Sequence, residues 1–154
     1  MYRIGIDLGG TNIAVGVVDD RHQIVAEASV PAGAHRPAEQ VVADMCRAVE
    51  LALDKAGLTA RDCVSIGVGA PGTCDPERGV VVCAYNLNWF DVPVCRMLTE
   101  HFGLPTHLSN DANCAALAET VAGAAVGCRN MVLITLGTGV GGGIIVDGKL
   151  VSGM

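Results

Sequence analysis

Three short apolar stretches follow one another at the start of the chain. The first covers residues 3–6 and the second residues 13–18, with the glycine pair Gly9–Gly10 between them. No helix-length pattern separates these two stretches, so they predict a hairpin of two strands that bends at the glycines. A third stretch at 22–30 predicts another strand, and the three together predict an antiparallel start to a sheet.

Longer stretches with helical spacing follow. Apolar residues recur at helical spacing from 38 to 56, and Gly57 stands where such a helix is expected to end. Residues 94–103 and the alanine-rich residues 111–125 predict two more helices. Short apolar runs predict strands between the helices, at residues 64–68, 80–83 and 106–109.

The first hairpin has a second copy near the end of the sequence. Residues 130–148 align without a gap on residues 2–20, 128 positions apart, and their apolar residues correspond in kind. Each copy bends at glycines beside a hydroxyl residue, Thr11 in the first and Thr138 in the second. Two such hairpins suggest two related halves that face one ligand, for which a polyphosphate is the natural candidate.

The bend of the first hairpin has the chemistry of an anion site. Gly9 and Gly10 allow backbone N–H groups to approach an anion closely, and Thr11 and Asn12 add side-chain donors. Asp7 stands beside the bend, where a carboxylate can hold Mg²⁺ directly or through water. The alternative is an ordinary glycine-rich turn next to a solvated acid.

Two segments match the sequence motif of a dinucleotide-binding site. Residues 67–72 and 137–142 both match G-x-G-x-x-G and both follow a predicted strand. The fingerprint binds pyrophosphate only when its last glycine opens a helix. A turn is expected after Gly72 and a strand after Gly142, so neither segment is expected to bind a dinucleotide.

A carboxylate stands where a predicted strand meets a predicted helix. Asp111 follows Asn110 at this junction, and both residue types are favoured helix N-caps, so capping alone is one interpretation. The other interpretation is that Asp111 takes a proton from a hydroxyl group that attacks a phosphoryl group. The amides of Asn110 and Asn86 suit sugar hydroxyls.

Composition narrows the class of protein. Of 154 residues, 51% are hydrophobic and 17% charged, which is typical of a folded domain, and the net charge of −6 argues against nucleic acid as a partner. No apolar run reaches the roughly 20 residues that a membrane span needs. No signal peptide follows Met1, so the protein is expected in the cytoplasm with its seven cysteines reduced. No two cysteines form a C-x-x-C pair, so no zinc site is expected within this chain.

Taken together and in this order, the motifs resemble those of the ROK family of bacterial sugar kinases and repressors, and within it the glucokinases. Residues 7–12 are similar to its first phosphate loop and residues 136–143 to its second. Residues 69–72 and 86–89 resemble its sugar-side loops. Residues 110–113 resemble the segment that carries a sugar-binding asparagine and the catalytic aspartate.

The resemblance implies an α/β fold of the actin-like, ribonuclease H-like ATPase type, with two similar domains around a cleft. Residues 1–126 would form the N-terminal domain, with its antiparallel start to a mixed sheet, and residues 127–154 the first hairpin of the second domain. Family members are expected to continue for about as many residues again. That further part would carry a glutamate and a histidine that hold the sugar, and a histidine–cysteine zinc cluster.

The resemblance also implies ATP-dependent phosphorylation of a hexose, first of all glucose at its 6-hydroxyl, with Mg²⁺. Asp111 would be the general base, and Gly72, Asn86, Asn110 and Asp111 would contact the sugar. The residues expected to line the phosphates or their Mg²⁺ are Asp7, Gly9, Gly10, Thr11, Asn12, Thr138 and Gly139. The full-length form is expected to be a cytoplasmic homodimer with no nucleic-acid or membrane partner.

Several alternatives stay open within this resemblance. The sugar is open between glucose, N-acetylmannosamine, fructose and allose, and the donor between ATP and polyphosphate. A sugar-sensing repressor would carry a helix-turn-helix before the first phosphate loop, where this sequence has only Tyr2 and Arg3 before the strand. A non-catalytic fragment that binds a partner or its own second half is the remaining alternative.

Overall fold

The computed structural model describes residues 1–33, 35–137 and 139–152. The chain forms two compact units, unit 1 (Met1–Ser109) and unit 2 (Asn110–Met154). All seven cysteines are free thiols. Among the described residues, no helix combines the length and the apolar character needed to cross a membrane.

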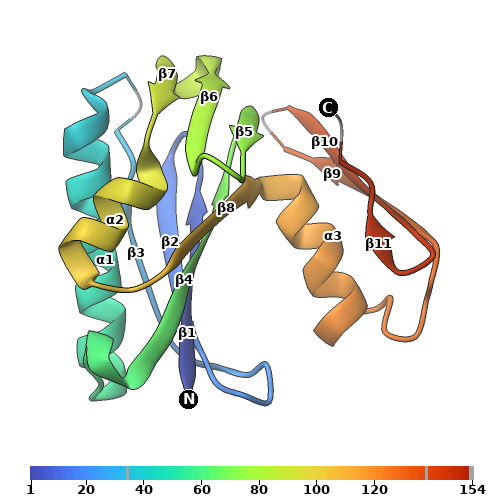
Figure 1. The fold of residues 1–154 in the computed structure, drawn as a ribbon, viewed down its shortest axis with the longest axis horizontal. Helices are drawn as coiled ribbons and strands as arrows, with labels where there is room; N and C mark the ends of the chain where they lie inside the picture. Colours follow the sequence, from blue (N-terminus) through green and yellow to red (C-terminus); the bar gives the residue numbers. More distant parts are fainter. Residues whose placement is uncertain (34, 138, 153–154) are drawn as a thin grey trace. The chain divides into compact units, whose positions relative to one another are not determined.

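Unit 1 is built on a five-stranded sheet. Its strands are β1 (Tyr2–Leu8), β2 (Asn12–Val18), β3 (Ile24–Pro31), β4 (Cys63–Ala70) and β8 (Thr106–Asn110). They follow the order β3-β2-β1-β4-β8 (Figure 1). β1, β2 and β3 pair antiparallel in succession, which confirms the predicted hairpin and third strand. β4 pairs parallel with β1, so the sheet is mixed.

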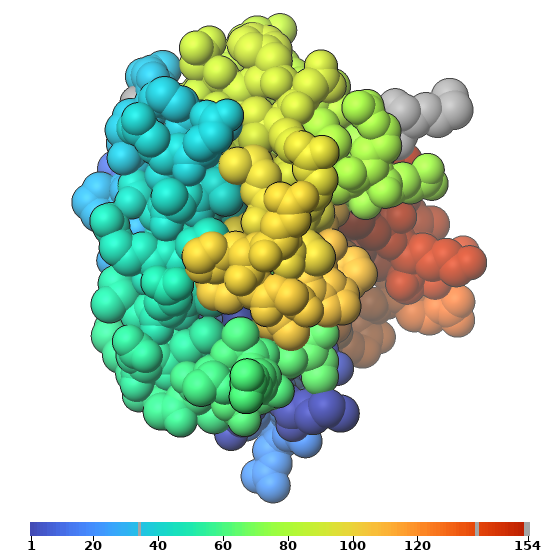
Figure 2. Space-filling view, turned by 60° about the vertical axis from the view of Figure 1, so that its left-hand side comes forward, coloured from blue at the N-terminus to red at the C-terminus, as the bar shows by residue number. Residues whose placement is uncertain are grey.

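A long helix covers one face of this sheet. This helix, α1 (Ala38–Ala56), packs against β2 and β3 and lies beside α2 (Val94–Phe102), as Figure 2 shows. Alternate residues of β1 are buried in the core: Ile4, Ile6 and Leu8. α1 ends as predicted, because Gly57 adopts a left-handed conformation with φ of 66° and donates its N–H to the carbonyl of Asp54.

A small three-stranded sheet also belongs to unit 1. It consists of β5 (Thr73–Asp75), β6 (Val80–Ala84) and β7 (Trp89–Val92), and the short 3₁₀ turn η2 (Tyr85–Leu87) joins β6 to β7. Only β6 was expected from the sequence. The turn expected after Gly72 is wrong, since β5 begins there and pairs with β6. No helix follows Gly72, so the objection to a dinucleotide site holds.

Unit 2 combines one helix with a second hairpin. Its elements are α3 (Asp111–Ala122), β9 (Met131–Leu136), β10 (Val140–Val146) and β11 (Lys149–Leu150). α3 packs against β9 and β10. It ends before the expected residue 125, because Gly123 is extended and the Glu119 carboxylate accepts the backbone N–H of Ala124. Antiparallel pairing of β9 with β10 confirms the predicted second hairpin.

The two hairpins differ in register by one residue. Leu8 pairs with Ile13 in the first hairpin, whereas the aligned Leu136 pairs with Val140 in the second. The bends therefore do not match residue for residue, although the sequences align without a gap. Because side chains alternate across a strand, the shift exchanges the faces of β9: Leu136 is exposed, while its counterpart Leu8 is buried.

The boundary between the two compact units lies earlier in the sequence than the predicted domain boundary. The compact units meet at residues 109 and 110, whereas the family resemblance places a domain boundary after residue 126. The difference arises because α3 packs against the second hairpin. The assignment of residues 1–126 and 127–154 to two ancestral domains stays a prediction, since ancestry and compact packing need not coincide.

Candidate functional site

The bend between β1 and β2 is a tight turn with polar side chains on its surface. The N–H of Gly9 donates to the carbonyl of Asn12 over 2.9 Å, and a Cβ placed on Gly9 would lie 3.0 Å from that oxygen. The N–H of Ala32 donates to the carbonyl of Thr11 over 2.8 Å, which ties the bend to the chain after β3. Thr11 and Asn12 are exposed. The bend thus has the fixed backbone and the donors of an anion site.

Two predicted loops leave the sheet at the same edge. Asp7 of β1 pairs with Gly69 of the parallel strand β4. The bend that follows β1 and the segment 69–72, in which β4 ends, therefore both lie at the carboxyl ends of these strands. Ligands of open α/β sheets usually bind at that edge. Asp7 is exposed there, where a carboxylate can reach a cation.

A predicted sugar contact lies against the predicted phosphate loop. Asn86 belongs to η2, and its Nδ2 would lie 3.4 Å from a Cβ placed on Gly10. This amide therefore reaches the bend, although the two residues are far apart in sequence. The structure therefore brings a residue predicted to contact a sugar close to a turn predicted to bind phosphate, both within unit 1.

Gly72 sets the path of the loop beside this amide. Its φ is 80°, and a Cβ there would lie 2.1 Å from the carbonyl oxygen of Cys83 and 2.9 Å from the Cα of Ala84. Only glycine can lie this close to the backbone of β6 with a positive φ. The contact lies at the end of β6, directly before the turn that carries Asn86. The structure therefore gives Gly72 a steric reason to be glycine, while its contact with a sugar stays a prediction.

At the start of α3, Asn110 and Asp111 have different roles in capping the helix. The side-chain oxygen of Asn110 accepts the backbone N–H groups of Ala112 over 3.0 Å and of Asn113 over 3.3 Å, so Asn110 is the N-cap. Asp111 is the first helical residue and is exposed, and its carboxylate accepts the N–H of Ala112 over 2.8 Å. Capping therefore depends mainly on Asn110, and the carboxylate of Asp111 lies at the surface of the helix start.

The second bend is only partly described. Thr138 lies outside the described residues. The carbonyl of Gly139 accepts the N–H of Gly137 over 2.9 Å. A Cβ on either glycine would meet nothing within 4 Å among the described residues, so packing gives no reason for glycine at these two positions.

The glycines that follow this bend have a role that the sequence analysis missed. A Cβ on Gly143 would lie 2.5 Å from the Cβ of Ala116 and 2.9 Å from the carbonyl oxygen of Ala112. A Cβ on Gly141 would lie 3.2 Å from the Cβ of Ala112. These glycines let α3, which carries Asp111, pack closely on β10. The signal was present in the sequence as alanines four residues apart on the helix and glycines two apart on the strand.

Comparison with known proteins shows which family this chain resembles. The family model of the ROK family matches residues 3–154. A glucokinase of Halalkalibacterium halodurans is 36% identical over 153 residues, which cover 99% of this chain and 46% of the relative. A xylose repressor of Caldicellulosiruptor bescii is 31% identical, over 97% of this chain and 38% of its own length. This chain thus spans about half or less of the length of these curated relatives.

A solved structure shows the same fold. The ROK family glucokinase from Streptomyces griseus, in complex with glucose and AMPPNP, has a TM-score of 0.91 and 40% identity, covering 100% of this chain and 47% of that chain. The predicted α/β fold of the actin-like ATPase type is thereby confirmed. Since the family model spans nearly the whole sequence and the fold agrees with it, this chain belongs to the ROK family.

Proposed function

We propose that this chain provides the first phosphate loop, the sugar-side loops and the catalytic carboxylate of an ATP-dependent hexose kinase that phosphorylates glucose at its 6-hydroxyl. The observation that carries the proposal is the approach of the Asn86 amide to the bend at Gly10. It joins hydrogen-bonding groups for a sugar to a backbone turn for phosphate. The related glucokinases, one of them in complex with glucose and AMPPNP, support these substrates.

The bend of the first hairpin is proposed to hold the phosphates of ATP. The backbone N–H of Gly10 and the side chains of Thr11 and Asn12 are the proposed donors for phosphate oxygens, while Gly9, whose N–H donates to the carbonyl of Asn12, shapes the turn that lines the phosphates. The exposed carboxylate of Asp7, beside this bend, fits a Mg²⁺ ion held by one carboxylate, water and phosphate. Bound there, Mg²⁺ would neutralise charge on the phosphates. From the second loop, Thr138 and Gly139 are proposed as further phosphate contacts.

Asp111 is proposed to orient and deprotonate the attacking hydroxyl group. As the 6-oxygen of glucose bonds to the γ-phosphorus and the bond to ADP breaks, the hydroxyl proton passes to the Asp111 carboxylate. Gly72, Asn86 and Asn110 are proposed to contact the other hydroxyl groups and so to fix the orientation of the sugar. Exposure of Asp111 at the start of α3 supports this role, because a substrate can reach the carboxylate.

A regulator is the second candidate. A xylose repressor is among the relatives, so the relatives of this chain include a regulator as well as kinases. Within the kinase proposal, glucose is preferred over N-acetylmannosamine, fructose and allose because several relatives are glucokinases. ATP is preferred over polyphosphate because one of these glucokinases was solved in complex with AMPPNP.

The test is a phosphorylation assay over a panel of hexoses, with the longest natural protein that contains this sequence (hereafter the extended protein). We expect glucose 6-phosphate to form from ATP and to cease when EDTA removes Mg²⁺. Phosphorylation of another hexose, with little phosphorylation of glucose, would show that the proposed substrate is wrong. Sugar binding without transfer to any hexose, from ATP or from polyphosphate, would contradict the kinase and favour the regulator.

A further inference from the structure

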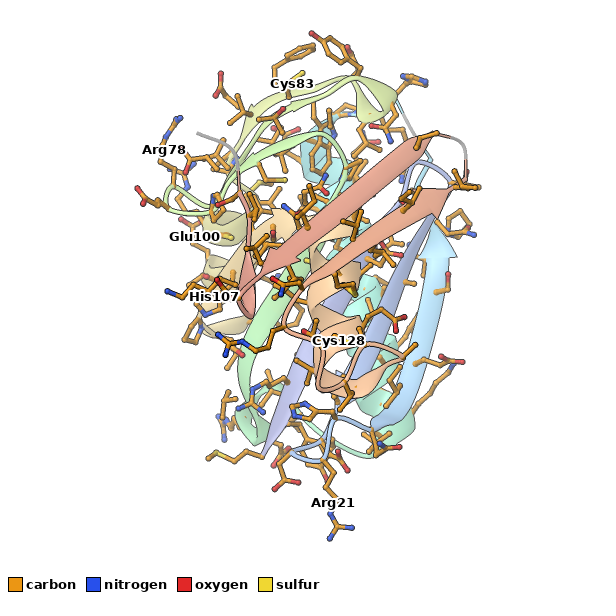
Figure 3. The ribbon with its side chains drawn as sticks, turned by 90° about the vertical axis from the view of Figure 1, so that its right-hand side faces the viewer. Arg21, Arg78, Cys83, Glu100, His107 and Cys128 are labelled. Atoms are coloured by element: carbon orange, nitrogen blue, oxygen red, sulfur yellow. The ribbon has the colours of Figure 1, made fainter. Side chains whose placement is uncertain are left out.

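The candidate phosphate bend is attached to the chain segment that follows β3. β2 and β3 lie side by side in unit 1, as Figure 3 shows, so the bend before β2 meets the segment after β3. The carbonyl of Thr11 in the bend accepts the N–H of Ala32 over 2.8 Å, and Ala32 is buried. The position of the bend therefore depends on what holds residue 32.

Arg36 holds this segment through two backbone carbonyl groups. Its Nη2 donates to the carbonyl of Ala32 over 2.6 Å, and its Nε donates to the carbonyl of Gly33 over 3.1 Å. Gly33 has a φ of 57°, and a Cβ there would lie 2.5 Å from the Nε of Arg36, so glycine leaves room for the guanidinium. A guanidinium presents several donors in fixed directions, which lets one side chain hold two successive carbonyl groups.

α1 holds Arg36 in turn. The guanidinium donates to the carboxylate of Asp44, which is the only buried charged side chain among the described residues. A buried carboxylate needs such a partner, because removing it from water is costly. Asp44 also pairs with Arg47, one turn further along α1, over 2.9 Å. Both arginines therefore neutralise the same carboxylate, but within the described part of the chain only Arg36 also binds the segment after β3.

We propose that Arg36 is a positioning residue for the phosphate site. It links Asp44 on α1 to Ala32, and through Ala32 to the bend at Thr11, so the bend keeps the position in which it receives the nucleotide. Arg36 acts through the backbone and does not itself contact the phosphates. This inference rests on the proposed function, because it takes the bend as the phosphate site.

The test measures nucleotide and sugar affinity separately, by isothermal titration of the extended protein with AMPPNP and Mg²⁺ and, in a second titration, with glucose. Arg36→Gln should weaken AMPPNP binding about tenfold, because groups that orient a binding residue typically matter by about 10–100-fold. Its affinity for glucose should stay within about twofold of the parent, since the proposed sugar contacts lie on other segments.

Arg47→Gln is the matched control. It removes the same charge and also takes one partner from Asp44, but it leaves the contacts of Arg36 with Ala32 and Gly33 in place. Both affinities should therefore stay within about twofold of the parent. Gly33→Ala is a second variant, which changes no charge but forces the guanidinium away, and it should weaken AMPPNP binding as Arg36→Gln does.

The possible outcomes separate this inference from the kinase proposal. The positioning role would be overturned if Arg36→Gln bound AMPPNP like the parent, or if Arg47→Gln weakened binding as much. Equal weakening of AMPPNP and glucose by Arg36→Gln would indicate general destabilisation and would overturn it as well. A parent protein that binds no AMPPNP would refute both the phosphate site and this inference. If nucleotide affinity alone falls but no sugar is phosphorylated, Arg36 keeps its role and the kinase proposal fails.

Discussion

Asn110 and Asp111 are neighbours at the start of α3, but they make different contacts. Asn110 accepts two backbone N–H groups from the first turn, as an N-cap does. Asp111 accepts one of the same N–H groups, and its side chain is exposed. The need for a cap therefore explains Asn110 and leaves the carboxylate of Asp111 to be explained by the helix dipole or by chemistry.

This difference predicts unequal effects on stability. In the 154-residue chain, Asn110→Ala should lower the free energy of unfolding by about 0.5–2 kcal/mol, because two N–H groups lose their acceptor. Asp111→Ala should cost less, about 0.3–1 kcal/mol, since the cap remains. Urea unfolding followed by circular dichroism measures both values. A larger loss for Asp111→Ala would show that Asp111 is the main cap.

At the scale of elements, small residues decide how α3 meets the second hairpin. Gly143 leaves no room for a side chain, because both Ala116 and the backbone of Ala112 lie within 3 Å of where a Cβ would be. Gly137 on the same hairpin has open space around it. Two glycines that look alike in the sequence therefore differ in what they do.

Gly143→Ala should destabilise unit 2 by about 1–3 kcal/mol, the usual cost of an overpacked contact. Gly137→Ala is the matched control and should change the free energy of unfolding by less than about 0.5 kcal/mol. Hydrogen exchange of the α3 amides provides the measurement. If exchange in the Gly143→Ala variant were as slow as in the control, the close approach of helix and strand would be refuted.

The element scale also shows what sequence patterns can predict. The longer strands, α1 and the order of the motifs were predictable, because each depends on local spacing of apolar residues and on glycine stops. The one-residue register shift between the hairpins was not, since pairing depends on how each bend closes. The contact between Asn86 and Gly10 was not predictable either, because it depends on how the small sheet of β5, β6 and β7 is placed. β5 and β11 are too short to give a pattern.

For the whole molecule, the main unexplained feature is an apolar face on the second hairpin. Leu136 and Val140 form a pair that is 81% and 79% exposed, and Ile134 on the same face of β9 is 65% exposed. Val132 and Ile144 pair on this face as well and are also exposed. The second hairpin therefore exposes a continuous row of apolar side chains.

Such a face should make the 154-residue chain associate with itself, because burying apolar surface is favourable. Light scattering after size-exclusion chromatography should give a mass above that of a monomer at micromolar concentration. Ile134→Lys should shift the chain toward monomer, while Leu51→Lys on the exposed side of α1 should not. A parent chain that stays monomeric at high concentration would contradict this expectation.

The 154-residue chain alone should not turn over glucose. It covers less than half the length of the related glucokinases, and phosphoryl transfer needs both substrates held in line with water excluded. A coupled assay of the purified chain with ATP, Mg²⁺ and glucose should therefore show no steady product, under conditions in which the extended protein is active. Sustained formation of glucose 6-phosphate by the short chain would show that its own residues suffice.

The role of Asp111 as general base can be tested by one substitution in the extended protein. Asp111→Asn keeps the shape of the side chain and can still accept the N–H of Ala112, but it cannot take a proton. We expect turnover to fall by a factor on the order of 10²–10⁴, with sugar affinity within about tenfold of the parent and an unchanged melting temperature. A variant that melts like the parent and retains more than about a tenth of its turnover would contradict the assignment of Asp111 as the general base.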